Sequence, residues 1–530
     1  MTSNPDPIHI VIGSGPSGVA VSTALLKKGK RVLMLDAGQT VEPHLSKTLD
    51  LLYSQASNDW DPLNIAAIEG QIAPSSKGIP LKYAYGSDFP YRGISPFPEI
   101  SWNESGILPS FALGGLSNVW GASVLPYSQE DLKDWPISLI DLAPHYREVE
   151  AMMNLIAEKD DLDLRFPIYS NKSGHIKQSN QAKDLLARLA TSREPLVTKG
   201  VTFGRSRLAH NLPSYAHGEG CISCGLCMYG CPKRQIYNSE STLKVLQRNP
   251  RFIYRRAVVE SFSEEGVQVI VKIYDPISHQ FEAIAAEKLF IAAGVVPTTT
   301  IVAKSLKWFN RSIKIKDSQY FLFPMLTSKS IQNVTTESIH TLAQLFIEIL
   351  QPSLCEKNIH LQIYTYNKLY SQLLNRWAGP FKSALNRHIQ AFLGKLIIAQ
   401  GYLHSDYSSE LSFELKGDVN QCSIQIRSIP NPQSKQVIGR LIHFLKKEKR
   451  LLHATPVSSM LKIAEPGRGF HSGGTIPMSL VPNEGMADEL GRPYSLKRVY
   501  CVDASVFSSI PSTTITLTAM ANAHRIGTNA

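Results

Sequence analysis

The first forty residues contain a short apolar run, a glycine-rich turn and a longer periodic segment. Residues 8–12 are apolar enough for a buried strand, and the glycines of 13–18 follow directly. Residues 19–26 carry apolar positions at helical spacing and end at a Lys-Lys-Gly stop. Residues 31–35 form a second apolar run that ends at Asp36. The pattern predicts a strand–turn–helix–strand unit of the dinucleotide-binding kind.

The middle of the chain alternates between irregular and periodic stretches. Residues 40–100 are rich in turn-forming residues, and 156–220 are irregular and polar, so we expect excursions over the surface there. Residues 138–155 have a helical pattern. Residues 252–296 alternate like a small sheet and end in an apolar strand at 288–294.

The segment 310–455 mixes one helical pattern with several strand patterns. Apolar residues at helical spacing predict a helix, and alternating apolar residues predict strands. The helical set is Ile339, Leu342, Phe346 and Ile349, and the alternating sets lie at 359–363, 411–415 and 424–426. Several strands with helices favour a separate substrate domain with a largely antiparallel sheet. Residues 455–530 return to glycine-rich turns and a final helix.

The composition is that of an ordinary folded protein. The chain has 530 residues, of which 43% are hydrophobic and 19% charged, with neither an export signal nor a spanning segment, so we expect it in the cytoplasm. The net charge of +11 reflects a solvated basic surface or favours anionic substrates, acidic redox partners or an anionic membrane. The charge is spread out and no recognition motif accompanies it, which argues against nucleic-acid binding. Two basic amphipathic stretches, 371–400 and 440–452, fit core-facing helices, with contact to a membrane surface as the alternative.

The glycines of the first turn have separate tasks in binding a nucleotide. The first permits the turn, the second lets the backbone approach a pyrophosphate, and the third lets helix and strand pack closely. The helix that follows offers free N–H groups to phosphate, and the acid that ends the second strand accepts a hydrogen bond from the ribose. The predicted nucleotide contacts in this unit are Gly13, Gly15, Pro16, Ser17, Gly18, Asp36 and Ala37.

Four of the seven cysteines lie close together in the run CISCGLCMYGCP. The spacing C-x2-C-x2-C-x3-C-P is typical of ferredoxin-type iron–sulfur ligands, so we expect a [4Fe–4S] cluster. Structural zinc and a metal-free group of thiols are the alternatives. The predicted ligands are Cys221, Cys224, Cys227 and Cys231. Whether Cys231 binds the same cluster as the other three is left open, because in two-cluster ferredoxins the fourth cysteine of such a run binds the other cluster.

The basic pair Lys233 and Arg234 follows the cysteine run directly. These side chains could receive an acidic one-electron carrier such as a ferredoxin or flavodoxin. The alternative is an ordinary solvated basic loop.

Several segments together resemble the glucose–methanol–choline (GMC) family of FAD oxidoreductases. They are the N-terminal unit, PGRGFHSGGTIPMSL at 466–480 and RVYCVDASVFSSIPSTTITLTAMANAHRI at 498–526. FALGGLSNVWGASVLPY at 111–127 is similar to the flavin-facing loop of the branch that holds pyranose oxidases and bacterial sugar or sterol dehydrogenases. The resemblance implies an α/β fold, α+β overall, with a Rossmann-like FAD-binding domain and a largely antiparallel substrate-binding domain.

The resemblance also implies domain bounds and FAD contacts. The discontinuous FAD-binding domain would comprise 1–45, 100–135, 221–305 (with the cysteine loop 221–232) and 460–530, and the substrate-binding domain 310–460 with parts of 46–99 and 136–220. Further FAD contacts would be Gly114, Ser117, Asn118, Val259, Ala293, Asp503, Ala504, Thr514 and Ile515. The position of the branch's FAD-linking histidine is Val119, which has no nucleophile, so we expect non-covalent FAD.

By the same resemblance, His471 in the turn HSGGT is the catalytic base that takes the hydroxyl proton. A histidine suits this task because its pKa lies near the working pH. The family's second catalytic residue is an Asn or His, and its position here is Thr514. Thr513 is the alternative if the register shifts by one. A threonine can hydrogen-bond a substrate oxygen but cannot act as a second base.

The sequence therefore predicts an FAD-dependent dehydrogenase that oxidises a CH–OH group of a sugar or polycyclic alcohol. A cluster would relay electrons from the flavin to a one-electron carrier. The alternatives are a flavin-dependent reductase or isomerase fed by the cluster, and a non-catalytic FAD-binding protein with structural metal.

Overall fold

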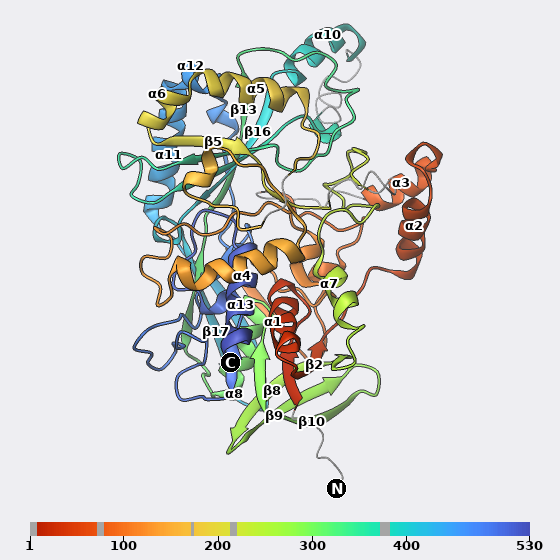
Figure 1. Ribbon diagram of the computed structural model, residues 1–530, viewed down its shortest axis with the longest axis vertical. Coiled ribbons are helices and arrows are strands. Elements are labelled where there is room, and N and C mark those ends of the chain that lie inside the picture. Colours follow the sequence, from red (N-terminus) through yellow and green to blue (C-terminus); the bar gives the residue numbers. More distant parts are fainter. Residues whose placement is uncertain (1–7, 71–78, 171–173, 212–219, 371–381) are drawn as a thin grey trace.

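The computed structural model describes residues 8–70, 79–170, 174–211, 220–370 and 382–530. One part is a parallel five-stranded sheet in the order β22-β11-β1-β2-β7. Its strands are β1 (Ile8–Ile12), β2 (Arg31–Asp36), β7 (Phe252–Arg256), β11 (Lys288–Ile291) and β22 (Val499–Cys501). Helix α1 (Pro16–Lys27) packs on α13 (Thr516–Asn529), which packs in turn on α4 (Leu139–Met152). The two ends of the chain thus build one layer together (Figure 1).

The tight first turn explains why two of its glycines are needed. Gly13 has φ +98°, and a Cβ there would lie 2.5 Å from the carbonyl oxygen of Ala292. A Cβ on Gly18 would lie 1.9 Å from the carbonyl oxygen of Gly13. Only residues without a side chain let β1, α1 and the neighbouring strand approach this closely.

A second, antiparallel sheet forms the other end of the molecule, in the order β19-β13-β16-β15-β14-β5 with β20 beside β13. Its strands are β5 (Val201–Arg205), β13 (Tyr320–Thr327), β14 (Leu345–Ile349), β15 (Ile359–Tyr364), β16 (Leu396–Leu403), β19 (Ala454–Pro456) and β20 (Lys462–Ile463). Helices α5 (Asn180–Thr191), α6 (Arg193–Thr198), α11 (Pro432–Lys447) and α12 (Lys449–Leu452) share an apolar core with this sheet. They cover one face of it and leave the other for the site (Figure 1).

The structure also contains smaller sheets. A five-stranded sheet has the order β21-β12-β17-β18-β3, and β8, β9 and β10 form a three-stranded sheet at the lower end of Figure 1. Their strands are β3 (Ile100–Asn103), β8 (Val258–Glu265), β9 (Gln268–Asp275), β10 (Gln280–Ala286), β12 (Ser312–Asp317), β17 (Glu410–Gly417), β18 (Cys422–Ile429) and β21 (Ser472–Gly473). The remaining elements are β4 (Leu155–Ile156), β6 (Leu208–Ala209), α2 (Pro43–Ser54), α3 (Pro62–Glu69), α7 (Ser239–Leu246), α8 (Val295–Ser305) and α10 (Lys382–Leu393).

The predicted fold class is confirmed, and so is the strand–turn–helix–strand unit at the N-terminus. The helix predicted from Ile339 to Ile349 is wrong, because 345–349 is strand β14. Both faces of β14 are covered, so every residue of it is apolar or buried and no alternation is visible. Residues 40–100 were expected to be irregular, yet they include α2 and α3, which project from the body (Figure 1). The segment expected to be irregular at 156–220 includes α5, α6 and β5.

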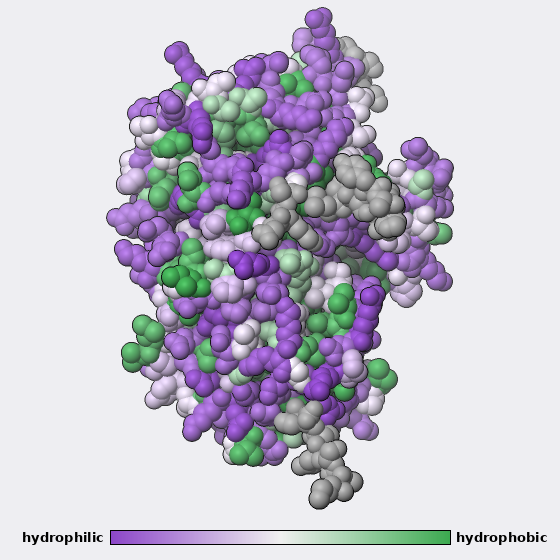
Figure 2. All heavy atoms as spheres, viewed as in Figure 1, coloured by the Kyte–Doolittle hydropathy of each residue, from purple (hydrophilic) through white to green (hydrophobic). Residues whose placement is uncertain are grey.

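The basic stretch 440–452 belongs to α11 and α12 and faces the core, as expected. Val437, Leu441 and Leu445 of α11 are buried against the second sheet. The first part of the other stretch, 371–381, lies outside the described residues, and α10 follows it. No described helix combines the length and the apolar character needed to cross a membrane. The face drawn in Figure 2 is mostly hydrophilic, with hydrophobic residues scattered over it.

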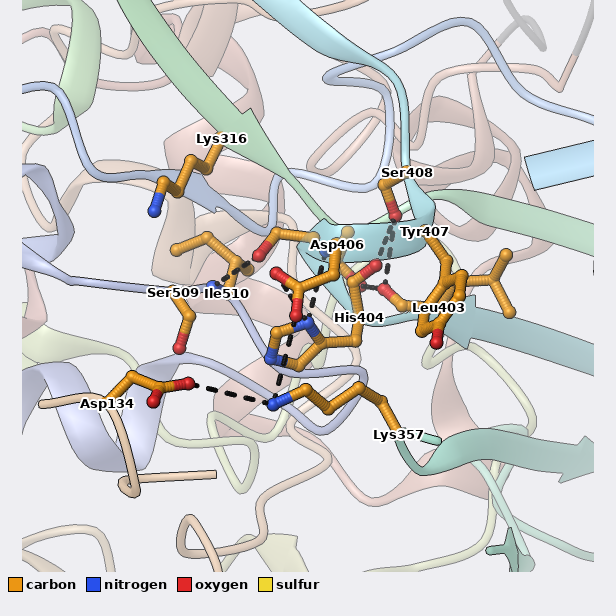
Figure 3. A network of polar contacts seen from close by, with 12 residues as sticks. Asp134, Lys316, Lys357, Leu403, His404, Asp406, Tyr407, Ser408, Ser509 and Ile510 are labelled. Atoms are coloured by element: carbon orange, nitrogen blue, oxygen red, sulfur yellow. Dashed lines mark hydrogen bonds and ion pairs between the residues drawn. The ribbon is translucent and has the colours of Figure 1, made fainter. Parts of the chain in front are cut away.

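A polar network joins the second sheet to the C-terminal segment (Figure 3). Lys357 lies between the carboxylates of Asp134 and Asp406, at 3.9 and 3.8 Å. The backbone N–H of Ser405 donates to the carbonyl of Ile510 at 2.8 Å, and the N–H of Ile510 donates to the Ser405 hydroxyl at 3.1 Å. These contacts hold the segment before Thr514 against the turn that follows β16.

Candidate active site

A cavity of about 940 Å³ lies where the two main parts meet. The N-terminal turn, the loop 107–123 and the turn around His471 line it. The free face of the second sheet, from β13, β15 and β16, forms a further wall. Residues from both ends and the middle of the chain therefore share one enclosed space, as an active site at a domain interface requires.

Most of the predicted nucleotide and flavin contacts line this cavity. They are Gly13, Gly15, Pro16, Ser17, Asp36, Ala37, Ser117, Val259, Ala293, Asp503, Ala504, Thr514 and Ile515. Gly18, Gly114 and Asn118 do not line it and shape its walls instead. The N–H of Gly114 donates to the Ser14 hydroxyl at 2.9 Å. The Asn118 amide donates to the carbonyls of Leu113 and Gly115 at 2.9 and 2.7 Å, which holds the turn of the loop.

Asp36 ends β2 beside the N-terminal turn. Its carboxylate accepts hydrogen bonds from the backbone N–H and the hydroxyl of Ser14, at 3.1 and 2.8 Å. Burial raises the pKa of this carboxyl to about 6, although these hydrogen bonds lower it. The group lies in the position expected for a ribose contact, with Ser14 fixing its orientation.

The start of α1 fits the pyrophosphate of FAD. Its N-cap is Gly15, and no side chain caps the helix, so its first N–H groups are free to bind an anion. A Cβ built on Gly15 meets nothing within 4 Å, so the backbone borders open space there. FAD would be held by this turn, by Asp36 and by the Asp503–Ala504 segment that follows β22.

Asp503 is a rigid part of that wall. One carboxylate oxygen accepts from the Gly294 N–H at 2.9 Å and from the Thr298 hydroxyl at 2.5 Å, and the other accepts from the Ser505 N–H at 2.9 Å. Burial raises the pKa of the carboxyl. The residue therefore shapes the turn after β22 and positions the adjacent backbone toward the cavity.

His471 also lines the cavity. Its ring stacks on Tyr402 with a centroid distance of 4.6 Å, and its carbonyl accepts from the Ser318 N–H at 3.0 Å. Its Nδ1 has no hydrogen-bond partner among the described residues. Burial lowers the pKa of the imidazole to about 3, so the ring is neutral near pH 7 and one of its nitrogens carries a lone pair.

The turn that carries His471 is fixed by Asp317 at the end of β12. Asp317 accepts from the Gly467 N–H at 2.8 Å and from the Ser472 hydroxyl at 2.7 Å. Burial raises the pKa of this carboxyl to about 7. The contacts join the two ends of the turn, and thus set where the imidazole points.

Thr514 lies in the same cavity as His471. Its hydroxyl oxygen accepts from the Leu125 N–H at 2.8 Å, which leaves the O–H free to donate. Thr513 is fully buried and is absent from the cavity wall, and its hydroxyl has no partner in the described part of the chain. The geometry favours Thr514 over Thr513 as the residue that faces a substrate.

The residues on the sheet wall were not identified from the sequence. Tyr320, Gln362, Tyr364, Gln400 and Tyr402 project from β13, β15 and β16 into the cavity. Alternation within 359–363 identified a strand, and the apolar half of that pattern faces the helices. The same alternation implies that the polar residues of this strand point to the opposite face of the sheet. Only the packed sheet shows that this face borders the cavity.

Lys82 is a second residue that sequence reasoning missed. The residue lines the cavity, and its ammonium donates to the carbonyl of Trp120, in the loop 107–123, at 2.9 Å. Burial lowers its pKa to about 8, while nearby Cys227 and Cys231 raise it. The residue holds the loop and lies between the cavity and the cysteine run.

The four cysteines of the run do not form a metal site. Cys224 is exposed, Cys221 and Cys231 are half-buried and Cys227 is buried. In the described ranges no three His, Cys, Asp or Glu side chains form a group that could hold a metal ion. Burial raises the thiol pKa of Cys221 to about 11. This arrangement does not fit a preformed [4Fe–4S] site.

The basic pair after the run is already engaged with α2 and the turn that follows it. Lys233 donates to the carbonyls of Tyr53 and Gln55 at 2.7 and 2.6 Å. Arg234 pairs with Asp50 at 2.6 Å and lies over the ring of Tyr53. Both residues therefore attach the cysteine loop to the projecting helices, a task that the sequence did not suggest.

Sequence comparisons find a match to a family model in the C-terminal part. Residues 437–523 match the family model described as GMC oxidoreductase. The fructose dehydrogenase large subunit of Gluconobacter japonicus is 22% identical over 325 residues, which are 55% of this chain and 53% of that protein. The 2-methyl-1,2-propanediol dehydrogenase of Mycolicibacterium austroafricanum is 27% identical over 182 residues, which are 33% and 28% of the two chains. The chain thus spans about half or less of the length of these relatives.

Structure comparisons extend the likeness over the whole chain. Pyridoxine 4-oxidase from Mesorbium loti superposes with a TM-score of 0.61 at 11% identity, covering 99% of both chains. A formate oxidase from Aspergillus oryzae, studied for FAD modification, superposes with a TM-score of 0.58 at 13% identity, covering 98% of both chains. At such identities the likeness shows the fold. Together with the family match it confirms the predicted resemblance, apart from the iron–sulfur run.

Proposed function

We propose that this chain, a GMC-type oxidoreductase by its C-terminal family match and its fold, is an FAD-dependent dehydrogenase of CH–OH groups. The observation that carries the proposal is His471. The imidazole is neutral and half-buried, and it lines the same cavity as the dinucleotide-type turn, while its Nδ1 is buried without a partner among the described residues. A base in this position meets the first requirement of alcohol oxidation.

The residues of the site divide the work of the reaction. His471 would take the hydroxyl proton, and the Thr514 O–H would donate to the substrate oxygen. FAD, when bound, supplies the acceptor for the hydride that leaves carbon. The stacking of Tyr402 on His471 and the Asp317 contacts keep the imidazole in one orientation.

The sheet wall favours a sugar over a polycyclic alcohol as substrate. Tyrosine rings offer flat apolar faces, and the amides of Gln362 and Gln400 offer both donors and acceptors beside them. Alternating aromatic and amide groups suit a ring that carries several hydroxyls. The fructose dehydrogenase relative supports the same class.

The iron–sulfur cluster, its acidic carrier and the cytoplasmic location remain predictions from the sequence. The cluster rests on the cysteine spacing alone, since the described thiols do not fit a preformed site. No step of the proposed reaction passes through it. The noncovalent attachment of FAD likewise rests on Val119 and would be contradicted by yellow colour retained in acid-precipitated protein.

Anaerobic substrate screening tests the proposal. We expect sugars or related alcohols to bleach the flavin absorbance of the protein as isolated, with steady reduction of an artificial acceptor. Failure of every alcohol in the presence of bound flavin would favour the reductase or the non-catalytic alternative.

A further inference from the structure

Glu348 and His360 form a fully buried polar pair behind the wall of the cavity. They lie opposite each other on β14 and β15, and each is 0% exposed. The Nδ1 of His360 lies 2.5 Å from one carboxylate oxygen of Glu348. Neither residue lines the cavity. Burying such a pair is a poor way to gain stability, so its contacts with the site suggest a different role.

The contacts of the pair fix where its protons lie. Both oxygens of Glu348 receive N–H donors, from His360 and from the Asn358 amide at 2.5 Å, as an ionised carboxylate does. The Asn358 amide cannot turn over, because its oxygen accepts from Arg165 at 3.1 Å. His360 therefore donates through Nδ1.

The other ring nitrogen of His360 faces the amide nitrogen of Gln362 at 3.2 Å. With the Gln362 amide nitrogen toward the ring, Nε2 accepts, which corresponds to the neutral Nδ1–H tautomer of the imidazole. The amide oxygen of Gln362 accepts from the Tyr364 hydroxyl at 2.9 Å. Three hydrogen bonds thus connect Tyr364 to Glu348, and each is donated in the direction of Glu348.

Tyr364 brings the end of this chain into the site. It lines the cavity, and a Cβ on Gly121 would lie 3.4 Å from its hydroxyl oxygen. Gly121 belongs to the segment that resembles the flavin-facing loop. With its proton directed at Gln362, the Tyr364 oxygen offers only lone pairs to a molecule in the cavity.

Asn358 links the pair to the segment before Thr514. Its amide nitrogen donates to Glu348 and lies 3.4 Å from the Ser512 hydroxyl, two residues before Thr514. Glu348 is therefore connected through Asn358 to the turn that carries the predicted substrate contact.

We propose that Glu348 and His360 are positioning residues that hold Tyr364 as a hydrogen-bond acceptor for a hydroxyl of the substrate. This inference deepens the proposed oxidation of a polyhydroxylated alcohol and rests on it for the nature of the ligand. Tyr364 would accept from a hydroxyl next to the one that is oxidised. It therefore contributes to binding and takes no part in the proton transfer to His471.

A Glu348→Gln substitution should reverse the chain. Asn358 still donates, so the new amide must turn its oxygen to Asn358 and its NH2 to His360. The proton of His360 then moves to Nε2, the Gln362 amide turns over, and Tyr364 directs its O–H into the cavity. A purely structural role for the pair predicts no such change.

The first experiment reads the tautomer of His360 from histidine side-chain ¹⁵N spectra of the flavin-loaded protein, without substrate. A His360→Gln variant assigns the signal. We expect the Nδ1–H tautomer in the wild-type chain and the Nε2–H tautomer in Glu348→Gln. An imidazolium or an Nε2–H tautomer in the wild-type chain would overturn the proposal.

The second experiment measures anaerobic flavin reduction over a range of alcohol concentrations. Loss of one hydrogen bond in Glu348→Gln or Tyr364→Phe should raise the half-saturating concentration about tenfold, with the limiting rate within about threefold. The double variant should be no worse than Tyr364→Phe alone. Glu414→Gln, a buried carboxylate on β17 away from the cavity, is the matched control and should behave as wild type.

The outcomes distinguish the role of Tyr364 from the proposed function. An unchanged half-saturating concentration in Tyr364→Phe would overturn the role of the tyrosine. If Glu348→Gln does not fold, the wild-type spectrum and Tyr364→Phe still decide. If no alcohol reduces the wild-type flavin, the proposed function is wrong. The role of Tyr364 as an acceptor for a substrate hydroxyl is then wrong as well. The ¹⁵N spectrum still decides the protonation of Glu348 and His360.

Discussion

At the scale of single residues, the proposed oxidation depends most on His471. Replacement by alanine should lower the rate of flavin reduction by about 10²-fold or more, on the scale of a lost general base, while FAD stays bound. His279→Ala, on the distant β9–β10 turn, is the matched control. Rapid-mixing spectroscopy under anaerobic conditions measures the rate. Near-normal reduction with intact flavin would remove His471 from the mechanism.

The pH dependence of the same rate follows from the burial of His471. Burial lowers the pKa of the imidazole to about 3, below the ordinary value of 6.5, so the base form persists as the pH falls. We expect reduction at pH 5 to be within about twofold of the rate at pH 6.5, whereas a base of ordinary pKa would lose more than tenfold. A decline with an apparent pKa near 6.5 would contradict this, provided that the flavin content is unchanged at pH 5.

His471 and Thr514 could be proposed from sequence because each lies in a motif with its own glycine or proline context. Lys82, Tyr364 and Gln362 have no such context. Their position in the site depends on which side of a sheet faces the cavity. Packing between segments that are distant in the sequence decides this.

At the scale of elements, the N-terminal turn can be tested without disturbing the fold. A methyl group on Gly15 meets no protein atom within 4 Å, so Gly15→Ala should leave the unfolding temperature of flavin-free protein unchanged. The methyl would occupy space that a pyrophosphate needs, so FAD affinity should fall about tenfold or more. Equilibrium titration with FAD measures the change. Gly439→Ala on α11, which also meets no atom within 4 Å, is the control and should bind FAD normally.

The cysteine run gives a second test at this scale. If the spacing prediction holds, anaerobically purified protein contains about four iron and four sulfide per chain. A Cys227→Ser variant should lose iron and keep FAD, and Cys355→Ser is the matched control. Replacing Cys231 and recounting iron decides the fourth ligand. Metal-free protein, or zinc in place of iron, would contradict the prediction.

The elements that the sequence predicted correctly are those with a strong local signal. The βαβ unit has its glycines, and α4 and α13 have clear periodicity. Strand β14 was mistaken for helix because it is covered on both faces, so its residues do not alternate. Helices α2 and α3 were missed because their apolar residues form a small separate cluster with Leu226 of the cysteine loop.

At the scale of the whole molecule, the site exists only where two sheets meet. The nucleotide turn comes from the first residues, the base and Thr514 from the last hundred, and the opposite wall from the antiparallel sheet. The order of these segments could be recognised from sequence by resemblance. The cavity wall and the buried pair behind it could not, because they depend on long-range register between β14, β15 and β16.

The central claim is that this cavity oxidises an alcohol with FAD, using His471 as base. The most direct measurement is the visible spectrum of anaerobic, FAD-loaded protein mixed with a panel of sugars and other alcohols. The account predicts that at least one sugar bleaches the flavin in the wild-type chain and about 10²-fold more slowly in His471→Ala. Flavin that no alcohol bleaches, but that a chemical reductant does, would contradict it.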